Sequence, residues 1–285
     1  MSKAIATERS YFESFLKGLA VVLAAVVATS AYFTVEKVLP PSRSATSVVI
    51  VSRGTPARLE GIAKRVGAAT VDILSSNSYT GSADAGTGMI LTSNGEVLTN
   101  NHVIAGGTTI TAQVDGAGRE YRAKVVGVDP TMDVAVLQLQ GASGLPVVPL
   151  GNSAKVKVGE AVVAIGNALN LSGPPTVTSG TISGTHQSVC ASLGMGDHVE
   201  QLFGMIRTDL VIYPGDSGSP LVDASGQVIG MNTAALRSGR FGYIGPAIGA
   251  AIPIKQAMAV VRAIRRHESG NGVELIAEAG GGAWK

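Results

Sequence analysis

The sequence has a single cysteine, few aromatic residues and few charged ones. With only Cys190 present, no disulfide can form within the chain. Aromatic residues make up 4% and charged residues 15% of the 285 positions, and the net charge is +2. Lysine and arginine are scattered rather than clustered, which argues against nucleic acid as a partner. The hydrophobic core must therefore be built mainly from small and branched side chains.

Potential metal ligands are equally sparse. His186 and His198 fall in one predicted loop, 186–204, but no spaced set of cysteines or carboxylates accompanies them, so we expect surface histidines. Cys190 has no histidine among its immediate neighbours, and we expect a buried or incidental thiol, with a functional thiol as the alternative. The sequence thus predicts neither a metal nor a cofactor.

One long apolar segment stands apart from the rest. Residues 18–35 carry no charge, and a helix of that length rises about 27 Å, close to the thickness of the hydrocarbon core of a bilayer. It predicts a transmembrane helix or uncleaved signal anchor after an N-terminal tail, residues 1–17, and so a membrane as partner. A cleavable signal peptide, followed by secretion, is the alternative. Three basic residues lie on each side, so charge does not indicate the orientation.

Most of the remaining chain has the pattern of an all-β protein. Between about residues 69 and 253, short apolar runs alternate with turn residues roughly every 8 to 12 positions, which is typical of barrels and sandwiches. The turns 93–95 and 224–226 end in glycine and predict hairpins. Roughly a dozen strands exceed one small barrel, so we predict two six-stranded antiparallel barrels, at about 69–150 and 151–253.

The segments around these barrels have other patterns. Residues 36–54 look like a linker, and the predicted globular domain covers 55–268. Apolar residues recur at helical spacing in 55–67 and again in 254–268, which predicts a helix at each end of the domain. Residues 269–285 form a glycine-rich tail.

Three short segments carry the residue types of nucleophilic catalysis. His102 follows the run LTNN, Asp133 precedes VAVL, and Ser217 lies within PGDSGS. A serine hydroxyl is a weak nucleophile at neutral pH and needs a neighbouring base, for which histidine is suited by its pKa. A buried carboxylate can orient that histidine. The three residues therefore predict a catalytic triad.

The glycines beside the serine have a chemical reason of their own. An attacked carbonyl develops negative charge, which backbone N–H groups can stabilise. The N–H groups of Gly215 and Ser217 are the predicted oxyanion hole, and Gly218 allows a sharp turn after the nucleophile.

These motifs resemble the HtrA/DegP group of trypsin-like serine proteases. The similarity runs from about residue 60 to 265 and includes GTGMI from Gly86, GEVLTNNH ending at His102, DVAVL from Asp133, and PGDSGSPL around Ser217. It implies a chymotrypsin-like fold with the triad between the barrels. It also implies an extracytoplasmic serine endopeptidase that acts on exported or misfolded polypeptides. Self-association into a homo-oligomer stays open.

The sequence departs from that group at two places. The group commonly has asparagine before the nucleophilic serine, whereas this chain has Asp216, whose partner would be a basic side chain or a newly cut N-terminus. The printed sequence also ends about 20 residues after the last predicted helix. A PDZ domain normally follows there in this group, and we expect this chain to lack it.

The same resemblance places Val211 and Ile212 at the substrate pocket. Neither is acidic, so we expect cleavage after small or medium apolar residues rather than after lysine or arginine. The alternative is that both are ordinary core residues.

Three other functions compete with that of an active peptidase. One is an inactive binding or chaperone module, and another is a protease that stays latent until assembly or cleavage. The third is an α/β-hydrolase, disfavoured by Ser219 and by the His–Asp–Ser order.

Overall fold

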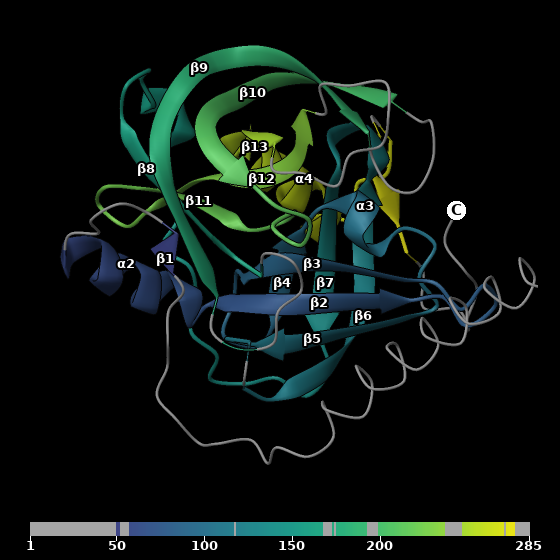
Figure 1. Ribbon diagram of the computed structural model, residues 1–285. Helices are drawn as coiled ribbons and strands as arrows, with labels where there is room; N and C mark the ends of the chain where they lie inside the picture. Colours follow the sequence, from purple (N-terminus) through teal and green to yellow (C-terminus); the bar gives the residue numbers. More distant parts are fainter. Residues whose placement is uncertain are drawn as a thin grey trace, which may run out of the picture. The chain divides into compact units, whose positions relative to one another are not determined.

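Two closed antiparallel β-barrels form the described part of the chain (Figure 1). The computed structural model describes residues 50–51, 57–116, 118–167, 173, 175–192, 199–236, 247–270 and 272–276. Each barrel contains six strands, so the predicted two-barrel, chymotrypsin-like fold is confirmed.

The N-terminal barrel closes through pairing of its last two strands. Its spatial order is β6-β5-β2-β3-β4-β7, and β7 pairs again with β6. Its interior is filled by branched side chains such as Ile73, Ile90 and Leu137, as the scarcity of aromatic residues requires. The strands are β2 (Thr70–Ser76), β3 (Ala83–Ile90), β4 (Glu96–Thr99), β5 (Thr109–Val114), β6 (Glu120–Asp129) and β7 (Val134–Leu139).

The C-terminal barrel repeats this plan with longer strands. Its order is β9-β10-β13-β12-β11-β8, and β8 closes the ring onto β9. Ile182, Leu210 and Leu221 lie in its core. The strands are β8 (Ala161–Gly166), β9 (Thr176–Ser192), β10 (Val199–Ile212), β11 (Pro220–Asp223), β12 (Val228–Leu236) and β13 (Ala247–Pro253).

Both predicted hairpin turns are present. The N–H of Gly95 donates to the carbonyl of Thr92 between β3 and β4, and Gly226 donates to Asp223 between β11 and β12. Gly95 has φ 91° and Gly226 has φ 84°. This left-handed region is costly for other residues, which explains why the turn signals in the sequence were reliable.

Within the described residues, helices cover the barrels at three places. They are α2 (Ala57–Gly67), α3 (Asn101–Ile104) and α4 (Ile254–Arg265), together with the short 3-10 helices η1 (Pro130–Met132) and η2 (Ser153–Lys155). The buried face of α4 packs on a cluster that contains Leu98 of one barrel and Met231 of the other. Arg265 of α4 also bonds to Glu96 of β4 at 2.6 Å. The last helix therefore ties the two barrels together.

Two short strands lie in segments that the sequence predicted to be irregular. In the predicted linker, β1 (Ile50–Val51) pairs in parallel with β9 at 177–178. In the predicted tail, β14 (Glu274–Leu275) pairs with β6 at 127–128. Both β9 and β6 are long strands that pair with one barrel neighbour over one half and with the other neighbour over the other half. Each therefore leaves a stretch of unpaired edge that a passing segment can complete.

The described residues of the predicted loop 186–204 are strand. The structure extends β9 to Ser192 and begins β10 at Val199, with irregular register at Leu202–Met205 and Arg207–Thr208. Bulges let a long ribbon bend without losing its pairing, and they hide the alternating pattern in the sequence.

The predicted transmembrane segment, residues 18–35, lies outside the described residues. Among the helices that are described, none is both long enough and apolar enough to cross a bilayer. The anchor therefore stays a prediction.

The docking of α4 can be tested at Ile264, which is buried against Gly127 of β6. Replacing Ile264 with alanine should lower the free energy of unfolding by about 2–4 kcal/mol, because the cavity cannot fully collapse. Urea unfolding would measure this. Arg262→Ala, on the exposed face of the same helix, should change stability by less than about 0.5 kcal/mol. Equal effects of the two substitutions would contradict the packing described here.

Candidate active site

The three predicted triad residues come from both barrels. His102 lies on α3, directly after β4, and Asp133 lies between η1 and β7 of the same barrel. Ser217 lies in the loop 213–219 between β10 and β11 of the C-terminal barrel. A site built from them must therefore span the boundary between the barrels.

His102 and Asp133 form a close pair. Nδ1 of His102 lies 2.9 Å from Oδ2 and 3.0 Å from Oδ1 of Asp133, and the backbone N–H of His102 donates to Oδ1 at 3.0 Å. A carboxylate can only accept, so Nδ1 carries the proton in this pair. The Nε2 atom of the neutral ring is then the acceptor, as a general base requires.

The local sequence explains how Asp133 reaches this position. Pro130 begins η1, and Asp129 caps it by accepting the N–H of Met132 at 3.1 Å. Asp133 then adopts the left-handed conformation, φ 52°, which aspartate tolerates better than most residues. Its own carbonyl accepts from Nδ2 of Asn100, the residue that precedes helix α3, at 2.9 Å. The carboxylate is therefore turned towards α3 and away from solvent.

A further residue at this site was not predicted from the sequence. Thr233 of β12 donates its hydroxyl to Oδ2 of Asp133 at 2.6 Å, and both side chains are fully buried. The one signal in the sequence was a polar pair, Asn232 and Thr233, at the end of the apolar run VIGM. The contact joins residues 100 positions apart, which spacing alone cannot reveal.

Ser217 is placed against the N-terminal barrel by its backbone. Its carbonyl accepts from the N–H of Thr87 in β3 at 2.8 Å. A Cβ at the neighbouring Gly86 would lie 2.7 Å from the methyl groups of Val103 and 3.1 Å from the Ser217 carbonyl. Gly86 therefore lies between the helix that carries His102 and the loop 213–219 that carries Ser217, which we call the serine loop.

The loop before Ser217 is a tight turn. The N–H of Asp216 donates to the carbonyl of Tyr213 at 3.0 Å, with Pro214 second and Gly215 third at φ 98°, as in a type II turn. The N–H groups of Asp216, Gly218 and Ser219 are all hydrogen-bonded. Among the described residues, those of Gly215 and Ser217 have no acceptor in the protein. These two N–H groups are the pair predicted from the sequence.

Asp216 is buried without an ionic partner in the described part of the chain. One oxygen accepts from the N–H of Tyr213 at 2.9 Å. Burial raises the pKa of Asp216 to about 6, although the bond from Tyr213 works in the opposite direction. The basic partner suggested by sequence reasoning is not found among the described residues.

The two predicted pocket residues point to opposite sides of β10. Val211 is 38% exposed, whereas Ile212 is 2% exposed and packs within the C-terminal barrel core. A Cβ at Gly249 of β13 would lie 3.0 Å from Cγ1 of Ile212 and closer still to Oγ1 of Thr208, so no side chain fits at Gly249. Both residues present only hydrocarbon.

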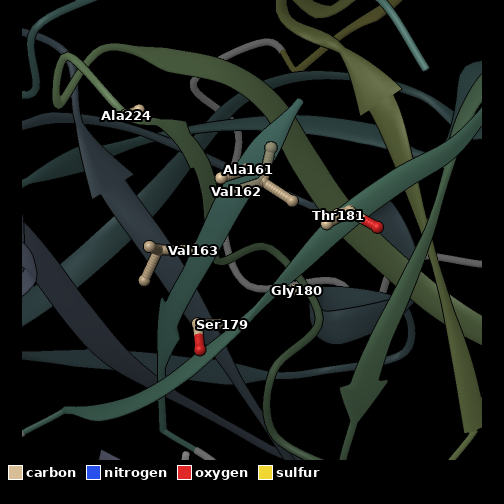
Figure 2. A pocket seen from close by; sticks show the side chains of 7 residues that line it. All are labelled: Ala161, Val162, Val163, Ser179, Gly180, Thr181 and Ala224. Carbon is tan, nitrogen blue, oxygen red and sulfur yellow. The ribbon is translucent and has the colours of Figure 1, made fainter. Parts of the chain in front are cut away.

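An apolar hollow lies at the far end of β8 (Figure 2). Residues 161–163 of β8, 179–181 of β9 and Ala224 line it. The other end of β8, Gly166, lies against Ser219 in the serine loop. Val163, the lining residue nearest to Gly166, is thus about 10 Å from it along the strand.

Within the described residues, no group of three or more His, Cys, Asp or Glu side chains is arranged to hold a metal ion. His186 is exposed in β9, with φ 56°, and His198 lies outside the described part. The side chain of His102, paired with Asp133, is one that can accept and release a proton.

The chain is similar to known peptidases over this region. Residues 86–231 match the family described as "Trypsin-like peptidase domain". A probable periplasmic serine endoprotease, DegP-like, from Chlamydia trachomatis is 42% identical over 62% of this chain and 33% of its own length. Serine protease PepD from Mycobacterium tuberculosis is 35% identical over 76% of this chain and 48% of its own. The chain thus spans a third to a half of these relatives.

Solved structures agree with these sequence matches. The structure titled "HtrA-type protease AlgW with tripeptide" has a TM-score of 0.62 and 36% identity, covering 74% of this chain and 64% of that one. The same protease with a decapeptide has a TM-score of 0.58 and 33% identity, over 73% of this chain and 68% of that one.

The burial of Asp216 leads to a pH-dependent prediction. At pH 8 the carboxylate is ionised in the folded and unfolded states, and its burial lowers the free energy of unfolding. Near pH 4 it is largely neutral when folded, so this cost disappears. Asp216→Asn should therefore be more stable than the original by about 1–3 kcal/mol at pH 8, and the gain should shrink as the pH falls through about 6 towards 4.

Chemical denaturation of both proteins across this pH range would measure the difference. Comparison at equal pH cancels other titrating groups, such as Asp72, whose pKa burial and the nearby Asp115 raise to about 7. An asparagine variant that is less stable at pH 8 would show that the carboxylate is stabilised by a positive group.

Proposed function

Because the chain belongs to the trypsin-like peptidase family, we propose that it is a serine endopeptidase with His102, Asp133 and Ser217 as its catalytic triad. The observation that carries the proposal is the buried carboxylate of Asp133, which binds His102 from one barrel and Thr233 from the other. That arrangement holds the imidazole of His102 in one orientation at the boundary between the barrels, where the backbone of Ser217 bonds to Thr87.

The proposed reaction uses these residues in sequence. Nε2 of His102 removes the hydroxyl proton of Ser217, and Oγ attacks the carbonyl carbon of the scissile peptide bond. The oxyanion that forms accepts hydrogen bonds from the N–H groups of Gly215 and Ser217. The imidazolium then gives its proton to the leaving amine, and an acyl-enzyme ester remains. Water attacks this ester with His102 again as base, which releases the acid and restores Ser217.

The proposed substrates are polypeptides cut after small or medium apolar residues. Val211 is partly exposed and offers no carboxylate to a lysine or arginine side chain, and Ile212, buried beside it, offers none either. Cleavage of a peptide library mainly after basic residues would refute this preference.

The proposed location of the protease domain is outside the cytoplasm, held to a membrane by residues 18–35. Support comes from the apolar sequence of that segment and from relatives named as periplasmic proteases. The natural substrates are proposed to be exported or misfolded proteins, as the resemblance implies. Secretion after removal of the segment is the alternative.

The proposal is tested by removing the nucleophile. The full chain, purified in detergent, should degrade unfolded casein, and Ser217→Ala should lower this activity at least about 1,000-fold without unfolding the protein. A fluorophosphonate probe should label the original protein and not the variant. Ser225→Ala, at the exposed β11–β12 turn, is the matched control and should keep both activity and labelling.

Mass spectrometry of the casein fragments would also report the residue before each cut. A folded original protein that neither cleaves casein nor reacts with the probe would instead favour the binding or chaperone module.

A further inference from the structure

Thr87 connects the serine loop to the barrel that carries the histidine. It is fully buried in β3, and each of its polar atoms is engaged. Its N–H donates to the carbonyl of Ser217 at 2.8 Å, and its hydroxyl lies 2.8 Å from the carbonyl of Gly215. Its own carbonyl accepts the hydroxyl of Thr99 at 2.7 Å.

The direction of the hydroxyl bond is fixed by chemistry. The backbone N–H of Asn167 lies 2.9 Å from Oγ1 of Thr87 and can only donate. The single hydroxyl proton is then directed to the carbonyl of Gly215. One hydroxyl therefore joins the end of β8 to the turn before Ser217.

These bonds hold both proposed oxyanion donors. Gly215 and Ser217 supply the two N–H groups, and their carbonyls are the two groups bound by Thr87. The peptide between Gly215 and Asp216 is held at both ends, because its N–H donates to Tyr213. Gly218 completes the contact, since a side chain there would overlap the carbonyl of Thr87.

The position of His102 also depends on strand β3. Gly86, next to Thr87, packs on Val103, which follows His102 on α3. The position of the oxyanion donors relative to the base is therefore set over a few residues of β3. A shift of about 1 Å in such a geometry is costly to catalysis.

We propose that the Thr87 hydroxyl is a positioning group that aligns the oxyanion donors of Gly215 and Ser217 with the proton-accepting histidine. The inference rests on the proposed peptidase function. Thr87 touches no reacting atom and acts through the serine loop. Its loss should affect the transition state, where the oxyanion exists, more than substrate binding.

The test compares Thr87→Val, which keeps the shape and removes the hydroxyl, with Thr87→Ser, which restores it. The matched control is Thr70→Val, since Thr70 is a buried threonine of the adjacent strand β2 whose hydroxyl also bonds to a backbone carbonyl, that of Gly67. All are measured in the full chain with a peptide substrate. Unfolding midpoints are recorded in parallel.

We expect Thr87→Val to lower kcat by about 10- to 100-fold, with KM within about threefold, as for the loss of oxyanion stabilisation. Its affinity for a peptide boronate, which forms a tetrahedral adduct with the serine, should fall by a similar factor. Thr87→Ser and Thr70→Val should retain kcat within about threefold. The pH profile should keep the same midpoint, because the histidine pair is not altered.

Equal kcat for Thr87→Val and Thr70→Val would overturn the positioning role, as would a loss confined to KM. If the valine variant does not fold, Thr87→Cys keeps the volume with a weak donor and should show the same loss of kcat. An inactive original protein would defeat the proposed function itself, which is a different outcome from an active protein indifferent to Thr87.

Discussion

The site depends on one buried charge, the carboxylate of Asp133. Removing an ionised group from water is costly unless hydrogen bonds replace its hydration. Three donors do so here: the backbone N–H and Nδ1 of His102 and the hydroxyl of Thr233. Because two come from one barrel and the third from the other, the carboxylate is fully satisfied only when the barrels are correctly docked. The requirement to pair this charge thus couples the packing of the fold to the orientation of the imidazole.

The fold and the candidate site residues could be predicted because their signals lie within short stretches of the sequence. Turn glycines such as Gly95 need left-handed backbone, and strands of branched residues alternate between turns, so the two barrels could be predicted. The proposed triad was predicted from residue chemistry and from the family motifs. Thr233 and Thr87 could not be found in this way, because a buried threonine in a strand is unremarkable until its partner is known. Their partners lie about 100 residues or more away, and only the folded chain brings them together.

The strands β1 and β14 and the long β9–β10 ribbon differ from the sequence-based prediction for a related reason. Pairing of a two-residue strand such as Ile50–Val51 depends on an edge left open by a distant long strand. Neither the length nor the composition of the short segment records that edge. The bulges of β10 likewise disturb the two-residue period from which strands are recognised. Long strands shared between two neighbours are therefore where local pattern is least informative.

Because the chain cannot form an internal disulfide, noncovalent contacts must hold the boundary between the barrels. A chain with one cysteine must align its barrels through packing and hydrogen bonds. It does so with α4, whose Arg265 reaches Glu96, with Thr233 on the carboxylate, and with Thr87 on the serine loop. The contact of Thr87 requires Gly218, because a side chain there would overlap the carbonyl of Thr87 across the barrel boundary. With glycine at position 218, the backbone of the serine loop comes close enough to β3 for the hydroxyl of Thr87 to bond to the carbonyl of Gly215. Alignment of the proposed base with the proposed oxyanion donors is thus a property of the interface between the barrels rather than of either barrel alone.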